Sequence, residues 1–114
     1  MEIKTDDYSV KYDIESDMVV CKGSLLLNSS AEYAPILDLF NTAAEKQVKP
    51  LTLDVRELEF LNSSGINTFT KFIVNVRKKK ILQLIAVGYG EIPWQVRFLK
   101  NLQRLMPALV LKLE

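Results

Sequence analysis

Segments with the two-residue period of a β-strand alternate along this chain with segments that have the 3.6-residue period of an amphipathic helix. This alternation limits the possible folds more than any other feature of the sequence. Residues 8–14 alternate apolar and polar side chains, turn residues follow at 15–17, and residues 18–27 continue as a second strand. So short a connection joins antiparallel strands. We therefore expect the chain to begin with a β-hairpin.

Three helices alternate with three strands in the rest of the chain. The first helix starts beside Ser29, whose spacing to Glu32 is that of a capping box, in which serine and glutamate bind free backbone amides. The helices are predicted at residues 29–47, 64–79 and 93–106, and the strands at residues 51–55, 81–87 and 109–113. The run at 81–87 is almost entirely apolar, which is typical of a parallel strand covered on both faces.

The order β-β-α-β-α-β-α-β predicts a single α/β domain over residues 1–114. We expect a mixed β-sheet of about four to five strands packed with about three to four helices. The length of 114 residues suits one domain. The N-terminus is polar and no apolar stretch reaches the ~20 residues that cross a bilayer. We therefore expect no membrane insertion and a cytoplasmic location.

The composition argues against most kinds of catalysis. The chain has no histidine, which excludes Ser-His-Asp and Cys-His nucleophiles and removes a common metal ligand. Its one cysteine, Cys21, lies in an apolar run and is predicted to be a buried small side chain. A net charge of +1 gives no overall field that would attract nucleic acid. We expect no catalytic residues, no metal, no cofactor and no nucleic-acid partner.

The turn Asn62-Ser63-Ser64-Gly65 is the strongest candidate for a functional site. It lies at the expected carboxyl end of the sheet, where open α/β sheets usually bind their ligands. Gly65 would let another backbone come close, and the free amides at the start of the following helix would favour a phosphate, either bound or attached to a serine. In the simpler interpretation, Asn62 or Ser63 only caps the helix, which contributes ~1 kcal/mol. The local pattern leaves both interpretations open.

Two other features also allow two interpretations, and for each we prefer the structural one. The basic run at residues 77–80 suits the negative end of a helix dipole, although it could bind phosphate. Trp94, at the start of the last helix, either anchors that helix or contacts a partner.

The two segments around the turn resemble the signature of the STAS family, the domain of anti-sigma-factor antagonists and of sulfate-transporter tails. They read Leu51-Thr52-Leu53-Asp54-Val55 and Leu58-Glu59-Phe60-Leu61-Asn62-Ser63-Ser64-Gly65-Ile66. The family has a Leu-Asp-Leu strand, an aromatic-apolar pair and then Asp-Ser-Ser-Gly-Leu. Gly23-Ser24-Leu25 is similar to its Gly-Glu-Leu-Asp opening, and the order of elements agrees over nearly the whole chain. Asn62 stands where the family usually has aspartate.

The resemblance implies a non-enzymatic, anti-sigma-factor-antagonist-like partner switch. In the family, a serine kinase that is often also an anti-sigma factor phosphorylates the first serine of the motif, and a phosphatase reverses the reaction. Phosphorylation breaks the complex between the antagonist and the kinase. By position, the acceptor here is Ser63. The expected partner-binding residues are Asn62, Ser64 and Gly65, together with Asn28, Ser29 and Ser30 if both loops lie at one end of the sheet.

Two alternatives remain beside this interpretation. The chain could be a constitutive STAS adaptor subunit of a larger complex, for example a lipid-transport ABC system, without phosphorylation. It could also bind a small phosphate ligand at the same helix N-terminus.

Overall fold

Three antiparallel strands form the N-terminal part of the sheet. The computed structural model describes residues 1–79 and 83–114. In it β1 (Glu2–Lys4) pairs with β2 (Tyr8–Asp13), and β2 pairs with β3 (Met18–Leu25). Asp17 closes the turn between β2 and β3 with a φ of 57°, a left-handed conformation that aspartate tolerates better than most residues. The predicted hairpin is confirmed, and β1 is an addition to it.

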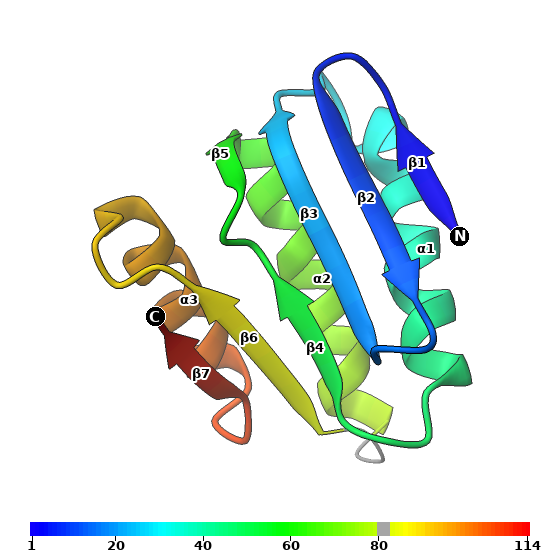
Figure 1. Ribbon diagram of the computed structural model, residues 1–114, viewed down its shortest axis with the longest axis vertical. Helices are drawn as coiled ribbons and strands as arrows, with labels where there is room; N and C mark the ends of the chain where they lie inside the picture. Colours follow the sequence, from blue (N-terminus) through cyan, green and yellow to red (C-terminus); the bar gives the residue numbers. More distant parts are fainter. Residues whose placement is uncertain (80–82) are drawn as a thin grey trace.

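Parallel strands form the rest of the sheet. The strand order is β1-β2-β3-β4-β6-β7, with β4 (Leu51–Asp54), β6 (Leu84–Gly88) and β7 (Val110–Leu113) all parallel to β3. The short strand β5 (Leu58–Leu61) follows β4 and pairs with the end of β3 (Figure 1). Within residues 1–79 and 83–114 the sheet therefore has seven strands, more than the four to five expected. β1 and β5 account for the difference. The three residues of β1 are too few to show a strand period, whereas residues 57–60 do alternate apolar and polar side chains but were not counted as a strand. Residues 81–82 of the predicted strand at 81–87 lie outside the described residues.

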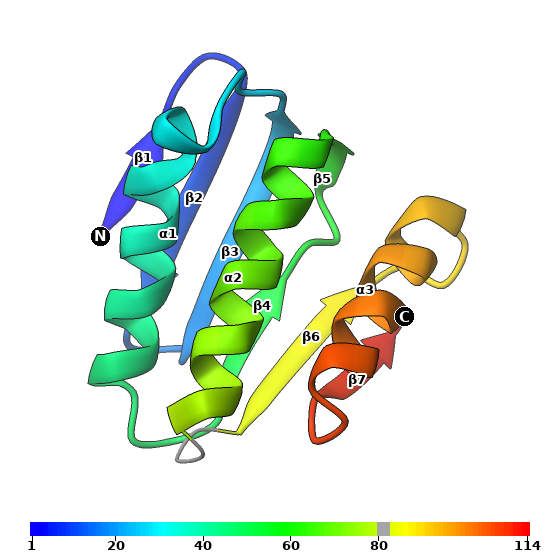
Figure 2. The same ribbon diagram turned by 180° about the vertical axis from the view of Figure 1, so that it is seen from behind.

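Three helices in the described part of the chain cover one face of the sheet (Figure 2). They are α1 (Ser30–Lys46), α2 (Ser63–Lys79) and α3 (Pro93–Leu105). The opposite face, which is turned to the viewer in Figure 1, has no helix across it in the described residues. No helix covers the described part of the run at 81–87 on this face, whereas the sequence predicted cover on both faces. Of the two β6 residues that share the face, Ile85 is half-buried and Val87 is buried.

The core fills the space between the sheet and the helices. Phe40 of α1 packs against Phe69 and Phe72 of α2, with ring centroids 5.0 and 5.2 Å apart. The predicted α/β fold with a mixed sheet is confirmed. Cys21 is buried, as predicted, and burial raises the pKa of its thiol well above the ordinary value. None of the helices in residues 1–79 and 83–114 is long and apolar enough to cross a membrane.

Candidate functional site

Asn62 caps α2 and leaves the serine that follows it outside the cap. The carbonyl of Asn62 accepts the first helical hydrogen bond from Ile66 N–H at 2.9 Å, and its Oδ1 accepts from Gly65 N–H at 2.9 Å. Ser63 and Ser64 therefore occupy the first two helical positions, and nothing in the described residues hydrogen-bonds to their N–H groups. Ser63 is exposed. The capping interpretation and the phosphate interpretation of this turn are compatible, because different residues carry them.

Asn62 also joins two loops that are far apart in the sequence. Its Nδ2 donates to the carbonyl of Leu27 at 2.7 Å, in the loop that precedes α1. The hydroxyl of Tyr33 lies 2.7 Å from Asn62 Oδ1 and 2.8 Å from the carbonyl of Leu25, and it accepts from Leu27 N–H at 3.3 Å. Burial raises the pKa of Tyr33, so this hydroxyl keeps its proton. An aspartate at position 62 could not donate to Leu27, which gives asparagine a physical reason here.

The loop before α1 lies at the same end of the sheet, beside the turn (Figure 2). Ser29 caps α1, accepting from Glu32 N–H at 3.3 Å. The Glu32 carboxylate reaches back to Asn28 N–H at 2.6 Å, one residue before the amide that a capping box usually binds. Asn28, Ser29 and Ser30 are exposed. The structure therefore brings together the loop at residues 28–30 and the turn at residues 62–65, which were predicted from the sequence to bind a partner.

Gly65 has an internal role. It is buried, and a Cβ at this position would lie 2.8 Å from the hydroxyl of Tyr33 and overlap Cδ1 of Leu61. From the sequence, Gly65 was expected to let a partner's backbone come close. In the structure, that space is taken by Tyr33 and Leu61, so the surface at this turn consists of Asn62, Ser63 and Ser64.

We expect Gly65→Ala to destabilise the fold by about 1 kcal/mol, although alanine is the better helix former. The overlap with Tyr33 and Leu61 opposes the gain in helix propensity. Urea unfolding monitored by circular dichroism measures the change. Gly90→Ala is the matched control, because its Cβ would meet Leu113 at an ordinary 3.7 Å. A Gly65→Ala protein at least as stable as wild type would contradict the packing seen around Tyr33.

An apolar groove of about 410 Å³ lies next to the turn. Phe60, Leu61 and Ile66 line one side, and α3 lines the other with Trp94 and Phe98. Phe60 is 59% exposed and Ile66 is 41% exposed. The sequence pattern did not mark Phe60 or Tyr33 as site residues. The available signal for Phe60 was an aromatic side chain two positions before the turn.

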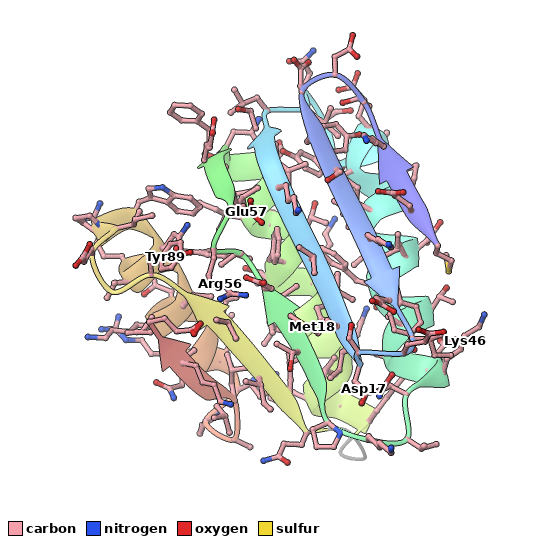
Figure 3. The ribbon with its side chains drawn as sticks, in the orientation of Figure 1. Asp17, Met18, Lys46, Arg56, Glu57 and Tyr89 are labelled. Carbon is pink, nitrogen blue, oxygen red and sulfur yellow. The ribbon has the colours of Figure 1, made fainter. Side chains whose placement is uncertain are left out.

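The charged side chains at the end of β4 have structural partners. Arg56, labelled in Figure 3, binds both carboxylate oxygens of buried Asp54 through its guanidinium, at 3.0 and 2.9 Å. The same group reaches Glu114 at 2.9 Å. The bonds to Asp54 raise the pKa of Arg56, and they leave Asp54 with a structural role. Within residues 1–79 and 83–114, no three His, Cys, Asp or Glu side chains are grouped for a metal ion.

The basic run at residues 77–80 and Trp94 also have defined contacts. Arg77 donates to the carbonyl of Leu105 at 2.9 Å, and Lys79 pairs with Glu45 at 3.1 Å. Lys80, the last residue of the basic run, lies outside the described residues. Trp94 is half-buried against Phe98, with ring centroids 6.0 Å apart, and it also lines the groove. Both interpretations of Trp94 thus have a structural basis.

No protein-family model matches the chain, and no curated protein is significantly similar to it. Solved structures do share its fold. The structure of the diguanylate cyclase SiaD in complex with its activator SiaC, from Pseudomonas aeruginosa, matches with a TM-score of 0.74 and 13% identity over 100% of this chain and 99% of that chain. Apo-SiaC from the same organism matches with a TM-score of 0.69 and 12% identity over 98% of both chains. Another SiaC structure matches with a TM-score of 0.66 and 15% identity over 87% of both chains. At these identities the likeness shows the fold, and this chain has the fold seen in these structures.

Proposed function

We propose that this chain is a non-enzymatic regulatory protein that binds a protein partner at the N-terminus of α2 and is switched by phosphorylation of Ser63. One observation carries the proposal. Ser63 is exposed at the first helical position, while Asn62 makes the hydrogen bonds that hold the turn. A kinase could therefore modify Ser63 without breaking the turn. The match to a structure of an enzyme in complex with its activator supports a protein partner for this fold.

Because Ser63 makes none of the hydrogen bonds that hold the turn, a phosphate on it affects the binding of the partner and not the stability of the fold. A phosphate adds about 1.5–2 negative charges. At the start of α2 it meets the positive end of the helix dipole and the two N–H groups of Ser63 and Ser64, which stabilise negative charge. The modified protein stays folded. A partner that covers this surface would have to desolvate the new charge, and the complex would weaken.

A reversible switch needs a serine kinase and a phosphatase, and either could be the partner or act on the complex. The partner in the matched complex is an enzyme, so the proposal does not include a sigma factor or a role in transcription. The constitutive adaptor differs in one testable respect, because its complex would not respond to charge at Ser63.

The decisive experiment compares partner binding by Ser63→Ala and Ser63→Asp. The partner is first recovered by cross-linking in the native host, and its affinity for each purified variant is then measured by titration calorimetry. We expect Ser63→Ala to bind like wild type and Ser63→Asp to bind roughly 10–100-fold more weakly, in the range of an interface charge that loses about 1.4–2.8 kcal/mol. Val48→Asp is the matched control, since Val48 is 96% exposed in the loop after α1, at the opposite end of the sheet.

Mass spectrometry after incubation with host extract and ATP tests the acceptor itself. We expect a phosphate on Ser63 that is missing from Ser63→Ala. Equal affinities for Ser63→Asp and wild type would favour the adaptor, and a phosphate only on other residues would exclude Ser63 as the switch.

A further inference from the structure

β5 has an outer edge that no strand in the described residues covers. β5 pairs with β3 on its inner side. On the outer side, β6 runs along β4 as far as the pair of Asp54 with Val87 and ends at Gly88, before it could reach β5. β5 thus lies beyond the end of β4 along the same side of β3 (Figure 1). β4 has β6 on its outer side, whereas β5 has no strand there in the described residues.

Three backbone groups of β5 point to this open edge. Asn62 N–H donates to the carbonyl of Leu25 in β3 at 3.2 Å. The carbonyl of Leu61 belongs to the same trans peptide group and therefore points the opposite way, to the outside. In a strand the N–H and the carbonyl of one residue share a side and neighbouring residues alternate, so Leu61 N–H points outward and Phe60 N–H points to β3. The carbonyl of Glu59 shares a peptide group with Phe60 N–H and therefore also points outward, while Glu59 itself lies at the register irregularity between β3 and β5. None of the three has a hydrogen-bond partner among the described residues.

Hollows flank the same edge on both faces of the sheet. The apolar groove lies on the helix side, between β5 and α3. A second hollow is lined by residues that include Lys22 of β3, which is exposed next to buried Cys21 and so points to the face without helices; this hollow therefore lies on the other side. The two share Glu59, Phe60 and Trp94, so the edge of β5 sits between them. An extended chain points successive side chains to opposite faces, and the two hollows would accept them alternately.

The helices beside the groove carry a one-sided charge. α2 and α3 contain seven basic residues and no acidic ones: Lys71, Arg77, Lys78, Lys79, Arg97, Lys100 and Arg104. Since the whole chain has a net charge of +1, the rest of it carries a net charge of −6. Arg97 lines the groove itself, as does one acidic residue, Glu59, while Arg77, Lys78 and Lys79 lie in the last turn of α2, away from the groove. The excess of basic residues over α2 and α3 as a whole favours a negatively charged segment.

We propose that the partner inserts an extended segment, with apolar side chains interleaved with acidic ones, as an additional strand on the free edge of β5. The backbone of that segment supplies the missing partners of Leu61 and Glu59, and its apolar side chains enter the two hollows. The proposal rests on the proposed function in taking the region of Ser63 as the partner's surface. It also gives the switch a geometric reason, because Ser63 lies between Leu61 and Ile66, which both line the groove. A phosphate there repels an acidic segment.

The test uses a phage-displayed library of random 12-residue peptides, selected on the full chain and counter-selected on Phe60→Asp. Phe60 is exposed, so its replacement leaves the core intact. We expect the selected peptides to alternate apolar residues with acidic ones and to bind at least ~10-fold more weakly to Phe60→Asp, the size of effect seen at interface anchors. Their affinities are measured by fluorescence anisotropy.

N-methylation of the selected peptides then tests which of their backbone N–H groups bind to β5, without altering the protein. N-methyl groups on one alternate set of residues should weaken binding by ~10-fold or more, because they block bonds to β5, and those on the other set should weaken it by less than ~3-fold. Equal losses from both sets, or apolar residues spaced three and four apart, would show a helical occupant and overturn the proposal. A failure to select any binder that depends on Phe60 would also overturn it.

The two proposals can fail separately. If native-partner binding ignores Ser63→Asp while the peptides show the alternate N-methyl pattern, the switch is wrong and the strand-addition site stands. If Ser63→Asp weakens the native complex while the peptides show no such pattern, the switch stands and the occupant of the groove is not a strand.

Discussion

Gln95→Glu is expected to destabilise the fold by about 3 kcal/mol, because it replaces a buried hydrogen-bond donor with an acceptor. Gln95 is fully buried near the start of α3. Its Nε2 donates to the carbonyls of Val55 at 2.9 Å and Leu58 at 3.2 Å, and its Oε1 accepts from Tyr89 N–H at 2.8 Å. A glutamate of the same shape would direct a carboxylate oxygen at those carbonyls. The loop that carries β5 away from β4 would lose its attachment to α3.

The pH dependence of this variant identifies the cause. Burial and the facing carbonyls would raise the pKa of the new carboxyl in the folded state above its unfolded value. The folded state then binds more protons, so the variant's stability relative to wild type is greatest below the unfolded pKa and falls as pH rises through the folded pKa. Urea unfolding at about pH 4.5 and pH 8 measures both values.

Gln103→Glu is the matched control for this change. Gln103 is half-buried at the other end of α3 and makes one bond of 3.0 Å to the carbonyl of Leu109. We expect it to cost about 1 kcal/mol. Equal losses for the two variants would show that the carbonyls around Gln95 do not carry its effect.

Periodicity alone was enough to predict most of the fold. The hairpin and the three helices each extend over enough residues to show a period of 2 or 3.6, and the run at β6 was apolar enough to mark a parallel strand. The capping pair of Ser29 and Glu32 located the start of α1 to within one residue. The turn at residues 62–65 was found because a serine-glycine break follows an apolar strand and begins a helix.

The remaining features depend on neighbours that a single sequence does not reveal. β5 is a strand because β3 extends past β4 and offers it a partner. Ile66 lies on the apolar stripe of α2, and periodicity shows which face of a helix is apolar without showing what covers it. The same applies to Gly65, since only the packed structure shows that Tyr33 takes the space its side chain would need.

Asn62→Ala is expected to cost about 2 kcal/mol and to loosen the loop before α1. The substitution removes the cap on Gly65 N–H, for about 1 kcal/mol. It also leaves the carbonyl of Leu27 without its donor, for about 1 kcal/mol more. Urea unfolding gives the total, and hydrogen exchange at the amides of residues 25–30 shows whether the loop opens. Asn67→Ala, at an exposed position of α2, is the control and should stay within about 0.5 kcal/mol of wild type.

Asn62→Asp separates the two roles of this residue. The carboxylate keeps the cap on Gly65 and gains from the positive end of the α2 dipole, but it faces the carbonyl of Leu27 with no proton to donate. We expect it to be less stable than wild type by about 1 kcal/mol, and to show the faster exchange in the loop that Asn62→Ala shows. Stability and loop exchange equal to wild type would mean that the bond to Leu27 does not hold the two loops together. In that case, the aspartate usual at this place in STAS proteins would serve this chain equally well. The expected loss would instead explain why a chain that ties its turn to a neighbouring carbonyl has an asparagine there.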